Sequence, residues 1–209
     1  KEKEMGLSLF KQDIGIDLGT ANTLVYIKGK GIVLDEASVI AYNTNTKKVI
    51  AVGNDAKNMI GAAPPHIKVV RPLRDGVISD FGMTHMMLKA FVGKVITTST
   101  FLTAVRVVIG VPSGVTEVEK RAFYELVADS KVKAKNIYIV DKPVADAIGA
   151  GLDVTKSRGI MMVNIGAETT EISVLSLGGI VISKSIKIGG NKLDDCIINN
   201  VKKVYNLVI

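Results

Sequence analysis

The chain has 209 residues, of which 47% are hydrophobic and 22% are charged, enough for one large domain or two small ones with a real core. The formal net charge is +7, and the lysines are scattered along the chain rather than clustered with aromatic residues, which make up only 5%. The composition therefore argues against a nucleic-acid-binding protein and favours a basic surface attracted to anionic lipid. No apolar run approaches the ~18 residues that cross a membrane, and the first residues lack the apolar segment of a secretory signal.

Short strands dominate the first quarter of the chain. Apolar runs separated by glycine- and asparagine-rich turns predict them over residues 13–18, 23–28, 32–34, 38–42 and 48–52. An extended segment follows at 67–78. Asp80 is then expected to cap a helix over residues 81–95.

A near-continuous apolar run over residues 106–111 is typical of a strand buried inside a parallel sheet. Thr116 and Glu119 form a capping box, which predicts a helix that begins there and ends near residue 130. A further strand is predicted over 136–140, and Pro143 fits the first turn of the next helix.

The last third repeats the opening pattern of the chain. After the polar residues 153–158, which mark a domain boundary, apolar runs at 160–163 and 172–175 predict a second hairpin. A strand over 180–188 and a helix over 192–205 follow. The helix is expected to bury an apolar stripe and the single cysteine: Leu193, Cys196, Ile197, Val201 and Val204. No equivalent of the buried parallel strand comes next, so we expect the chain to stop within its second half.

A glycine turn between two apolar runs occurs twice. The first is Asp17-Leu18-Gly19-Thr20-Ala21-Asn22-Thr23, and the second is Asn164-Ile165-Gly166-Ala167-Glu168-Thr169-Thr170. Such a turn can direct several backbone N–H groups at one anion, and glycine permits the close approach and the positive φ angles that we expect there. Two such turns predict two halves that face each other across one polyphosphate.

Four motifs, taken in this order, resemble those of the actin-like ATPases, and specifically the MreB proteins. Residues 15–26 resemble the first phosphate loop of the family, and residues 111–116 and 147–152 are similar to two further signatures. The fourth motif is Gly166 with Thr169-Thr170-Glu171, which matches the second phosphate loop in part. Ile188-Gly189-Gly190 followed by Asp194 is similar to the next segment of the family. The resemblance covers almost the whole chain.

This resemblance implies an α/β fold of duplicated actin-like (ribonuclease H-like) domains, each with a mixed five-stranded sheet flanked by helices. Residues 1–32 and 71–152 would form the first large subdomain, and 33–70 would form a small inserted subdomain. Residues 153–209 would begin the second large subdomain, whose remainder the sequence does not represent.

The resemblance also implies a site for ATP and Mg²⁺ between the two halves. Asp17 would lie near Mg²⁺ through water, with Asn164 as a weak second contact. The residues implied to hold the nucleotide come from the two loops and the segment after them: Asp17, Gly19, Thr20, Ala21, Asn22, Asn164, Gly166, Ala167, Glu168, Thr169, Gly189 and Gly190.

Two departures from the family pattern affect the expected chemistry. The family has a glutamate just before the proline of the helix that begins near Pro143, where it positions or activates the attacking water; here that residue is Lys142. A protonated lysine has no acceptor for a proton, although it can pair with a phosphate oxygen. The adjacent Asp141 is a doubtful replacement because neighbouring residues point in different directions.

The second departure lies in the second loop, where an aspartate of the family is Asn164 and two glycines are Ala167 and Glu168. We therefore expect ATP binding with low or absent hydrolysis and weakened metal positioning. The open alternative is that Lys142 points into solvent and hydrolysis is ordinary.

The resemblance implies a cytoplasmic protein, at the inner face of the cell membrane, that polymerises with itself for cell shape or motility. The helix at 116–130 would face either a second protofilament or solvent. Phe101 and Leu102 would either insert into an anionic membrane or close a hairpin on its own core. Other filament proteins are implied as further partners.

Two other functional classes share the superfold. One is a soluble ATP-dependent enzyme such as a sugar kinase, which needs a carboxylate base where this chain has Lys142. The other is a chaperone ATPase domain of the seventy-kilodalton heat-shock type. Because one fold serves all three classes, only the wording of the motifs separates them.

Overall fold

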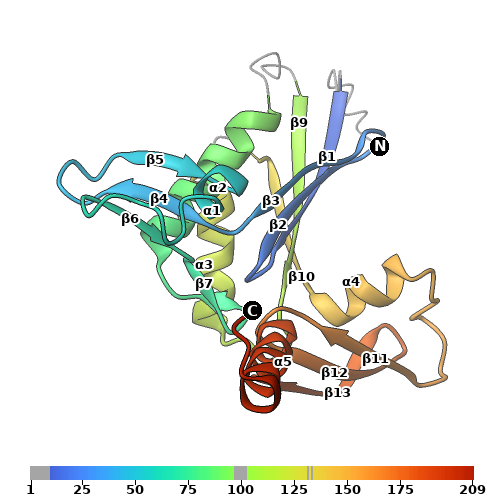
Figure 1. Cartoon of the computed structure of the whole chain (residues 1–209). Coiled ribbons are helices and arrows are strands. Elements are labelled where there is room, and N and C mark those ends of the chain that lie inside the picture. Colours follow the sequence, from blue (N-terminus) through green and yellow to red (C-terminus); the bar gives the residue numbers. More distant parts are fainter. Residues whose placement is uncertain (1–9, 97–102, 131, 133) are drawn as a thin grey trace.

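A computed structural model describes residues 10–96, 103–130, 132 and 134–209 (Figure 1). Phe101 and Leu102 lie outside these residues, so their contact with a membrane stays a prediction. No helix of the described residues combines the length and the apolar character needed to span a bilayer.

The centre of the molecule is a five-stranded sheet in the order β10-β9-β1-β2-β3. Its strands are β1 (Phe10–Leu18), β2 (Asn22–Ile27), β3 (Gly31–Ala37), β9 (Thr103–Val111) and β10 (Asn136–Asp141). β9 pairs in parallel with both β1 and β10, whereas β1, β2 and β3 are antiparallel. The sheet is therefore mixed, and the expectation of a parallel strand over 106–111 is confirmed.

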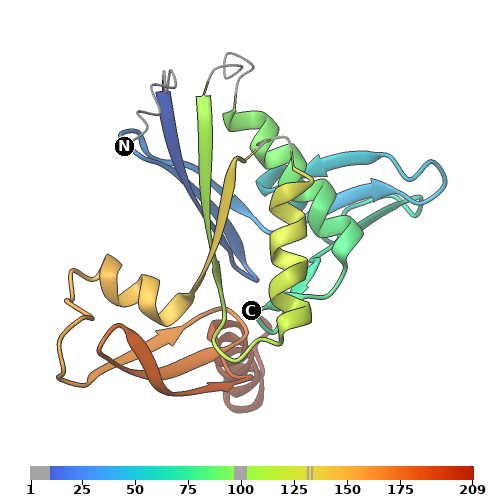
Figure 2. The same cartoon turned by 180° about the vertical axis from the view of Figure 1, so that it is seen from behind.

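Two helices, α2 (Phe81–Val95) and α3 (Glu117–Ala128), cover one face of this sheet (Figure 2). Every second residue of the central strands points at them and is buried, together with the inner faces of both helices: Ile14, Ile16, Leu18, Val107, Ile109, Val111, Met87, Phe91, Phe123 and Leu126. Both helices begin where the capping residues predicted. The carboxylate of Asp80 accepts a hydrogen bond from Met83 N–H at 2.9 Å, and the capping box of Thr116 with Glu119 is complete.

A smaller sheet lies beyond the helices in the order β5-β4-β6, with β4 (Ile40–Asn43), β5 (Val49–Val52), β6 (Ile67–Val70) and the short α1 (Asn54–Lys57). A two-stranded hairpin, β7 (Leu73–Arg74) and β8 (Val77–Ile78), leads from it to α2. β3 crosses the predicted subdomain boundary at residue 33 and pairs with β2 in the large sheet.

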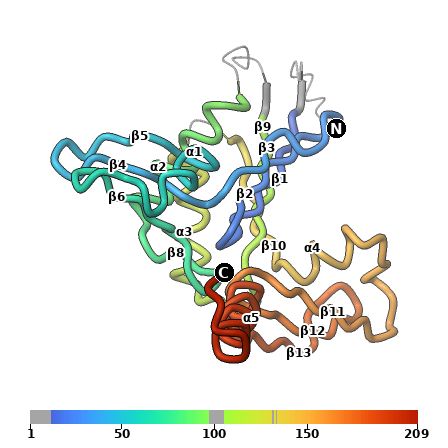
Figure 3. The backbone as a smooth tube through the Cα atoms, in the orientation of Figure 1, coloured from blue at the N-terminus to red at the C-terminus, as the bar shows by residue number. Residues whose placement is uncertain are grey.

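After β10 comes α4 (Lys142–Gly149), which is followed by an antiparallel sheet of β11 (Ile160–Ile165), β12 (Thr170–Ser176) and β13 (Gly179–Ile186). The last helix, α5 (Gly190–Tyr205), follows β13 and lies at one end of the molecule (Figure 3).

The expectation that α5 buries an apolar stripe is wrong for this chain. None of its residues is buried, and Leu193, Ile197 and Val204 are 51%, 58% and 60% exposed. Cys196 is also exposed rather than buried. The spacing of the stripe is that of an amphipathic helix, but none of the described elements covers that face.

Candidate functional site

The two glycine turns have the same backbone geometry. The N–H of Gly19 donates to the carbonyl oxygen of Asn22 at 3.0 Å, and the N–H of Gly166 donates to the carbonyl oxygen of Thr169 at 2.8 Å. A Cβ on Gly19 would lie 2.7 Å from the Asn22 oxygen, and one on Gly166 would lie 3.1 Å from the Thr169 oxygen. Close approach therefore explains both glycines. The expected positive φ is wrong, since neither glycine has one.

Residues of both turns line one cavity of about 190 Å³. Ten of the residues expected at the site line it: Asp17, Gly19, Thr20, Ala21, Asn22, Lys142, Asn164, Gly166, Ala167 and Thr169. They come from the β1–β2 turn, the start of α4 and the β11–β12 turn, which are far apart in the sequence. The structure therefore brings the two motifs together.

Four expected residues do not line this cavity, namely Asp141, Glu168, Gly189 and Gly190. The two glycines instead support the second turn from behind, because the N–H of Gly190 donates to the carbonyl oxygen of Gly166 at 2.9 Å. Asp141 is the residue before the first turn of α4, and its side chain makes no capping hydrogen bond.

Five residues outside the set implied to hold the nucleotide also line the cavity: Asp75, Gly76, Pro112, Glu171 and Ser185. The first two form the turn between β7 and β8, and this turn contacts both glycine turns. Gly76 N–H donates to the Thr20 hydroxyl at 3.1 Å, and Asp75 N–H donates to the Glu168 carboxylate at 2.7 Å. The Asp-Gly pair is a strong turn signal, but only the fold shows where that turn lies.

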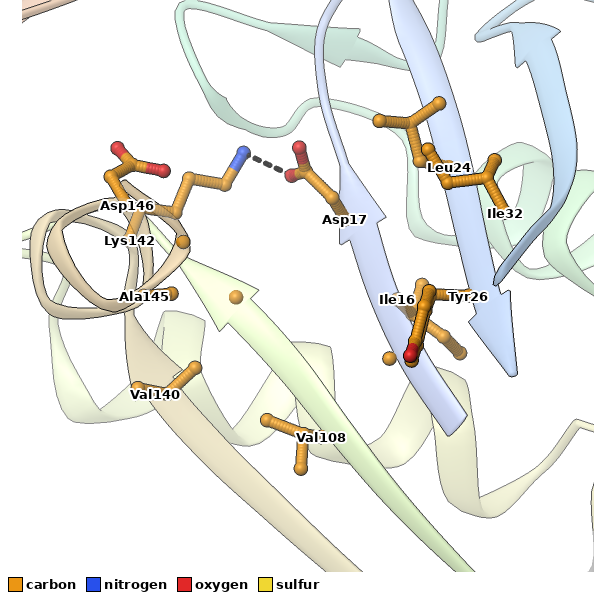
Figure 4. Close-up of a pocket in the computed structure, with 13 residues that line it drawn as sticks. Ile16, Asp17, Leu24, Tyr26, Ile32, Val108, Val140, Lys142, Ala145 and Asp146 are labelled. Atoms are coloured by element: carbon orange, nitrogen blue, oxygen red, sulfur yellow. Dashed lines mark ion pairs between the residues drawn. The ribbon is translucent and has the colours of Figure 1, made fainter. Parts of the chain in front are cut away.

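Lys142 points into the site. Its Nζ lies 2.7 Å from Oδ1 of Asp17, and its side chain is only 17% exposed (Figure 4). The same Nζ donates to the carbonyl oxygen of Leu18 at 3.4 Å. Lys142 and Asp17 also line a second, mostly apolar cavity of about 480 Å³ on the sheet face opposite α2 and α3. The alternative that Lys142 points into solvent is not what the structure shows.

Asn164 is held by a neighbouring carboxylate. Its Nδ2 donates to Oδ2 of Asp146, one turn along α4 from Lys142, at 2.6 Å. The side chain that replaces an acidic residue of the family pattern is thus fixed as a partner of α4.

Glu171 on β12 joins the two halves. It is 8% exposed, and it accepts hydrogen bonds from the N–H of Ser113, at 2.8 Å, and from the Ser113 hydroxyl. Burial raises the pKa of Glu171 above its ordinary value of 4.5, helped by the nearby Asp146 and opposed by the Ser113 hydrogen bond and the charge of Lys142. A carboxylate therefore faces the cavity with its ionised form disfavoured.

The donor set fits a divalent cation poorly. Mg²⁺ is usually held by one or two carboxylates, substrate phosphates and water. Asp17 is already paired with an ammonium group, and the amide nitrogen of Asn164 is committed to Asp146. Across residues 10–96, 103–130, 132 and 134–209, no three His, Cys, Asp or Glu side chains are grouped so that they could bind a metal.

Comparison with known proteins agrees with the motif pattern. A family described as MreB/Mbl protein matches residues 11–209. The cell shape-determining protein MreB of Escherichia coli (strain K12) is 46% identical over 205 residues, which are 96% of this chain and 58% of that protein. The cell shape-determining protein Mbl of Bacillus subtilis (strain 168) is 47% identical over 201 residues, 96% of this chain and 60% of that protein. The chain therefore spans about three fifths of these relatives.

Solved structures show the same architecture. MreB5 of Spiroplasma citri bound to ADP has a TM-score of 0.83 and 36% identity, covering 95% of this chain and 59% of that one. The same protein bound to AMPPNP has a TM-score of 0.84. A MamK double helical filament has a TM-score of 0.73 at 22% identity, covers 94% of this chain and 60% of that one, and supports the fold alone. The expected actin-like fold is confirmed.

Proposed function

This chain belongs to the MreB/Mbl protein family, and from that premise we propose that it binds ATP between its two glycine turns and polymerises into cytoplasmic filaments. In this proposal the filaments lie at the inner face of the cell membrane and serve cell shape or motility. Hydrolysis of the bound ATP is slow.

The observation that carries the proposal is the single cavity shared by the two turns. Backbone N–H groups of such turns bind phosphate oxygens without a charged side chain. The cavity is lined by Gly19 to Asn22 of the first turn and by Gly166, Ala167 and Thr169 of the second, so one polyphosphate could contact both halves. The related MreB5 of Spiroplasma citri has been solved with ADP and with AMPPNP, which supports a nucleotide as the ligand.

Slow hydrolysis follows from the groups around the cavity. Water attack on a phosphoryl group needs a residue that positions the water and accepts its proton. At the start of α4 the cavity offers Lys142, which has only donors. Asp141 does not line the cavity, and the carboxylate of Glu171 is held by Ser113. None of these described groups is placed as a free base.

Self-association is proposed from the relatives. The MreB and Mbl relatives are cell shape-determining proteins, and polymerisation is what the resemblance to the actin-like MreB proteins implies. In the full-length protein the exposed face of α3 is the proposed contact with a second protofilament.

A pelleting assay on the full-length protein tests filament formation. Sedimentation is compared without nucleotide, with ATP and Mg²⁺, and with a non-hydrolysable ATP analogue. We expect both nucleotides to increase the pelleted fraction, since assembly follows binding rather than hydrolysis. If no condition gives sedimentation, the filament proposal is wrong and a soluble ATP-dependent enzyme or chaperone ATPase becomes the better assignment.

Phosphate release tests the hydrolysis part separately. Lys142→Glu restores the carboxylate of the family pattern and should raise the rate at least about tenfold, because general base catalysis usually contributes about 10²–10⁴-fold. Lys156→Glu makes the same change of charge at an exposed lysine that pairs with Asp153, and should leave the rate unchanged. Equal rates in the wild type and in Lys142→Glu would show that position 142 does not limit hydrolysis.

A further inference from the structure

The cavity between the two turns contains one cationic side chain among the described residues that line it, Lys142. The other charged side chains there are acidic. Asp75 is paired outside the cavity lining with Lys187, at 2.7 Å, and Asp17 is paired with Lys142 at the same distance. The ammonium of Lys142 is therefore the positive charge that a bound polyphosphate would meet.

The path of the lysine side chain is defined by the sheet. Lys142 begins α4 directly after β10, whereas Asp17 lies near the end of β1, two strands away across β9. Between them lies Gly110, which is paired with Asp17 in the parallel register. A Cβ on Gly110 would come within 3.4 Å of the Lys142 Cγ, so the lysine stem crosses β9 over the one residue that has no side chain.

This ion pair competes with a divalent cation for the same carboxylate. A cation held through Asp17 would have to displace an ammonium group that lies 2.7 Å from Oδ1; the lysine side chain is 17% exposed and that of Asp17 is 53% exposed. Asn164 offers little compensation, because it is neutral and hydrogen-bonded to Asp146. The ammonium is a compact point charge on a flexible stem and can pair with phosphate oxygens directly.

The geometry points to the ammonium of Lys142 as a built-in replacement for the divalent cation beside Asp17, so that this protein binds the polyphosphate of a nucleotide without needing Mg²⁺. The inference rests on the proposed nucleotide site and specifies which cation accompanies the ligand there.

The test is a fluorescence titration of the full-length protein with a fluorescently labelled ATP, once in excess Mg²⁺ and once in excess EDTA. Two ligands whose binding is coupled usually change each other's affinity about 5–150-fold. If nucleotide binding does not need Mg²⁺, the Kd of the wild type should differ by less than about fivefold between the Mg²⁺ and EDTA buffers. Lys142→Gln removes the charge and should make the Kd at least about tenfold weaker in EDTA than in Mg²⁺.

Two further variants make the test specific. Gly110→Val keeps the lysine but places a side chain in its path, so it should gain the same Mg²⁺ dependence as Lys142→Gln. Lys156→Gln removes an exposed lysine that pairs with Asp153 and does not line the cavity, so it should behave as the wild type. Circular dichroism of each variant confirms that it is folded before it is titrated.

The outcomes separate this inference from the proposed function. Wild-type binding that is independent of Mg²⁺, with dependence gained in Lys142→Gln and Gly110→Val, supports it. Binding that weakens more than about tenfold in EDTA for the wild type overturns it while leaving the nucleotide site in place. Mg²⁺-independent binding in all variants also overturns it, since Lys142 would then not be the cause. Absence of binding in both buffers refutes the nucleotide site itself.

Discussion

Replacement of Gly189 by alanine tests how the second glycine turn is held. Gly189 is buried and precedes α5 with an extended backbone, φ −148°, which any residue can adopt. The obstacle is space, because an added Cβ would lie 2.5 Å from the Gly166 oxygen and 2.7 Å from two backbone atoms of Ala167. Backbone atoms cannot rotate away, so α5 and the turn have to separate.

The cost follows from the hydrogen bonds that this separation would break. Gly190 N–H donates to the Gly166 oxygen and Asn191 N–H donates to the Ala167 oxygen, each at 2.9 Å. Each bond contributes about 1 kcal/mol, and overpacking costs about 1–3 kcal/mol. The two costs do not add in full, because breaking the bonds relieves part of the overpacking. We therefore expect the free energy of unfolding to fall by about 2–4 kcal/mol in total. Each kcal/mol should lower the Tm of a chain of this size by about 2–4 °C.

Urea denaturation followed by circular dichroism measures this change, and nucleotide titration should show weaker binding in the same variant. Gly149→Ala is the matched control, since an added Cβ at this position in α4 meets nothing within 4 Å. It should be neutral or stabilising by up to about 1 kcal/mol. A Gly189→Ala protein with the urea midpoint of the wild type would show that α5 does not hold the turn.

Three further predictions concern other parts of the chain. Burial raises the pKa of Glu171 above 4.5, so this group stabilises the fold at low pH and loses that contribution as pH rises through the folded-state pKa. The stability of Glu171→Gln should therefore increase relative to that of the wild type as the pH is raised from about 4 to about 7. A difference in urea midpoint between the two proteins that is constant with pH would contradict this. Thr116→Ala removes the cap of α3 and should cost about 1 kcal/mol in urea unfolding, unlike the exposed Glu117→Ala; equal losses would mean that the capping box adds nothing. The double variant Phe101→Ser, Leu102→Ser should lose co-sedimentation with anionic liposomes if these residues insert, and unchanged binding would refute membrane insertion.

The starts of α2 and α3 were the most predictable part of the fold, because they depend on contacts between residues close in sequence. Asp80 accepts from Met83, and Thr116 accepts from Glu119, both three residues ahead. The helix predicted over residues 81–95 is found over the same residues. Burial against distant elements was less predictable. The stripe on α5 has the right spacing, but spacing does not say whether another element covers it.

The site was predictable only where a motif marked it. Both glycine turns could be found in the sequence, but their contact through Asp75 could not, since Asp75 and Glu168 are 93 residues apart. The same holds for the bond between Ser113 and Glu171, which are 58 residues apart. Such contacts depend on how the two halves meet, and a single sequence carries no local signal for that.

The two glycine turns have the same backbone geometry but differ in charge, because only the second turn contains a glutamate, Glu168. The structure shows where this carboxylate lies. Glu168 brings a negative charge to the second turn, and this charge would weaken phosphate binding if it faced the shared cavity. Its carboxylate instead accepts from Asp75 N–H, outside the lining of the shared cavity. There it helps line a neighbouring cavity of about 610 Å³ that also contains basic side chains: Lys68, Arg71 and Arg74.

The second turn can therefore present its backbone to an anion while its acidic side chain is used to join the halves. With the charge of Glu168 directed elsewhere, Asp17 and Lys142 determine the charge beside the first turn, and they form a pair. The proposed slow hydrolysis and the proposed nucleotide binding are then compatible in one site, because the same lysine that cannot act as a base supplies a cation for the phosphates. The comparison of Lys142→Glu with Lys142→Gln separates these two effects: only the first should raise phosphate release, whereas both should make binding depend on Mg²⁺.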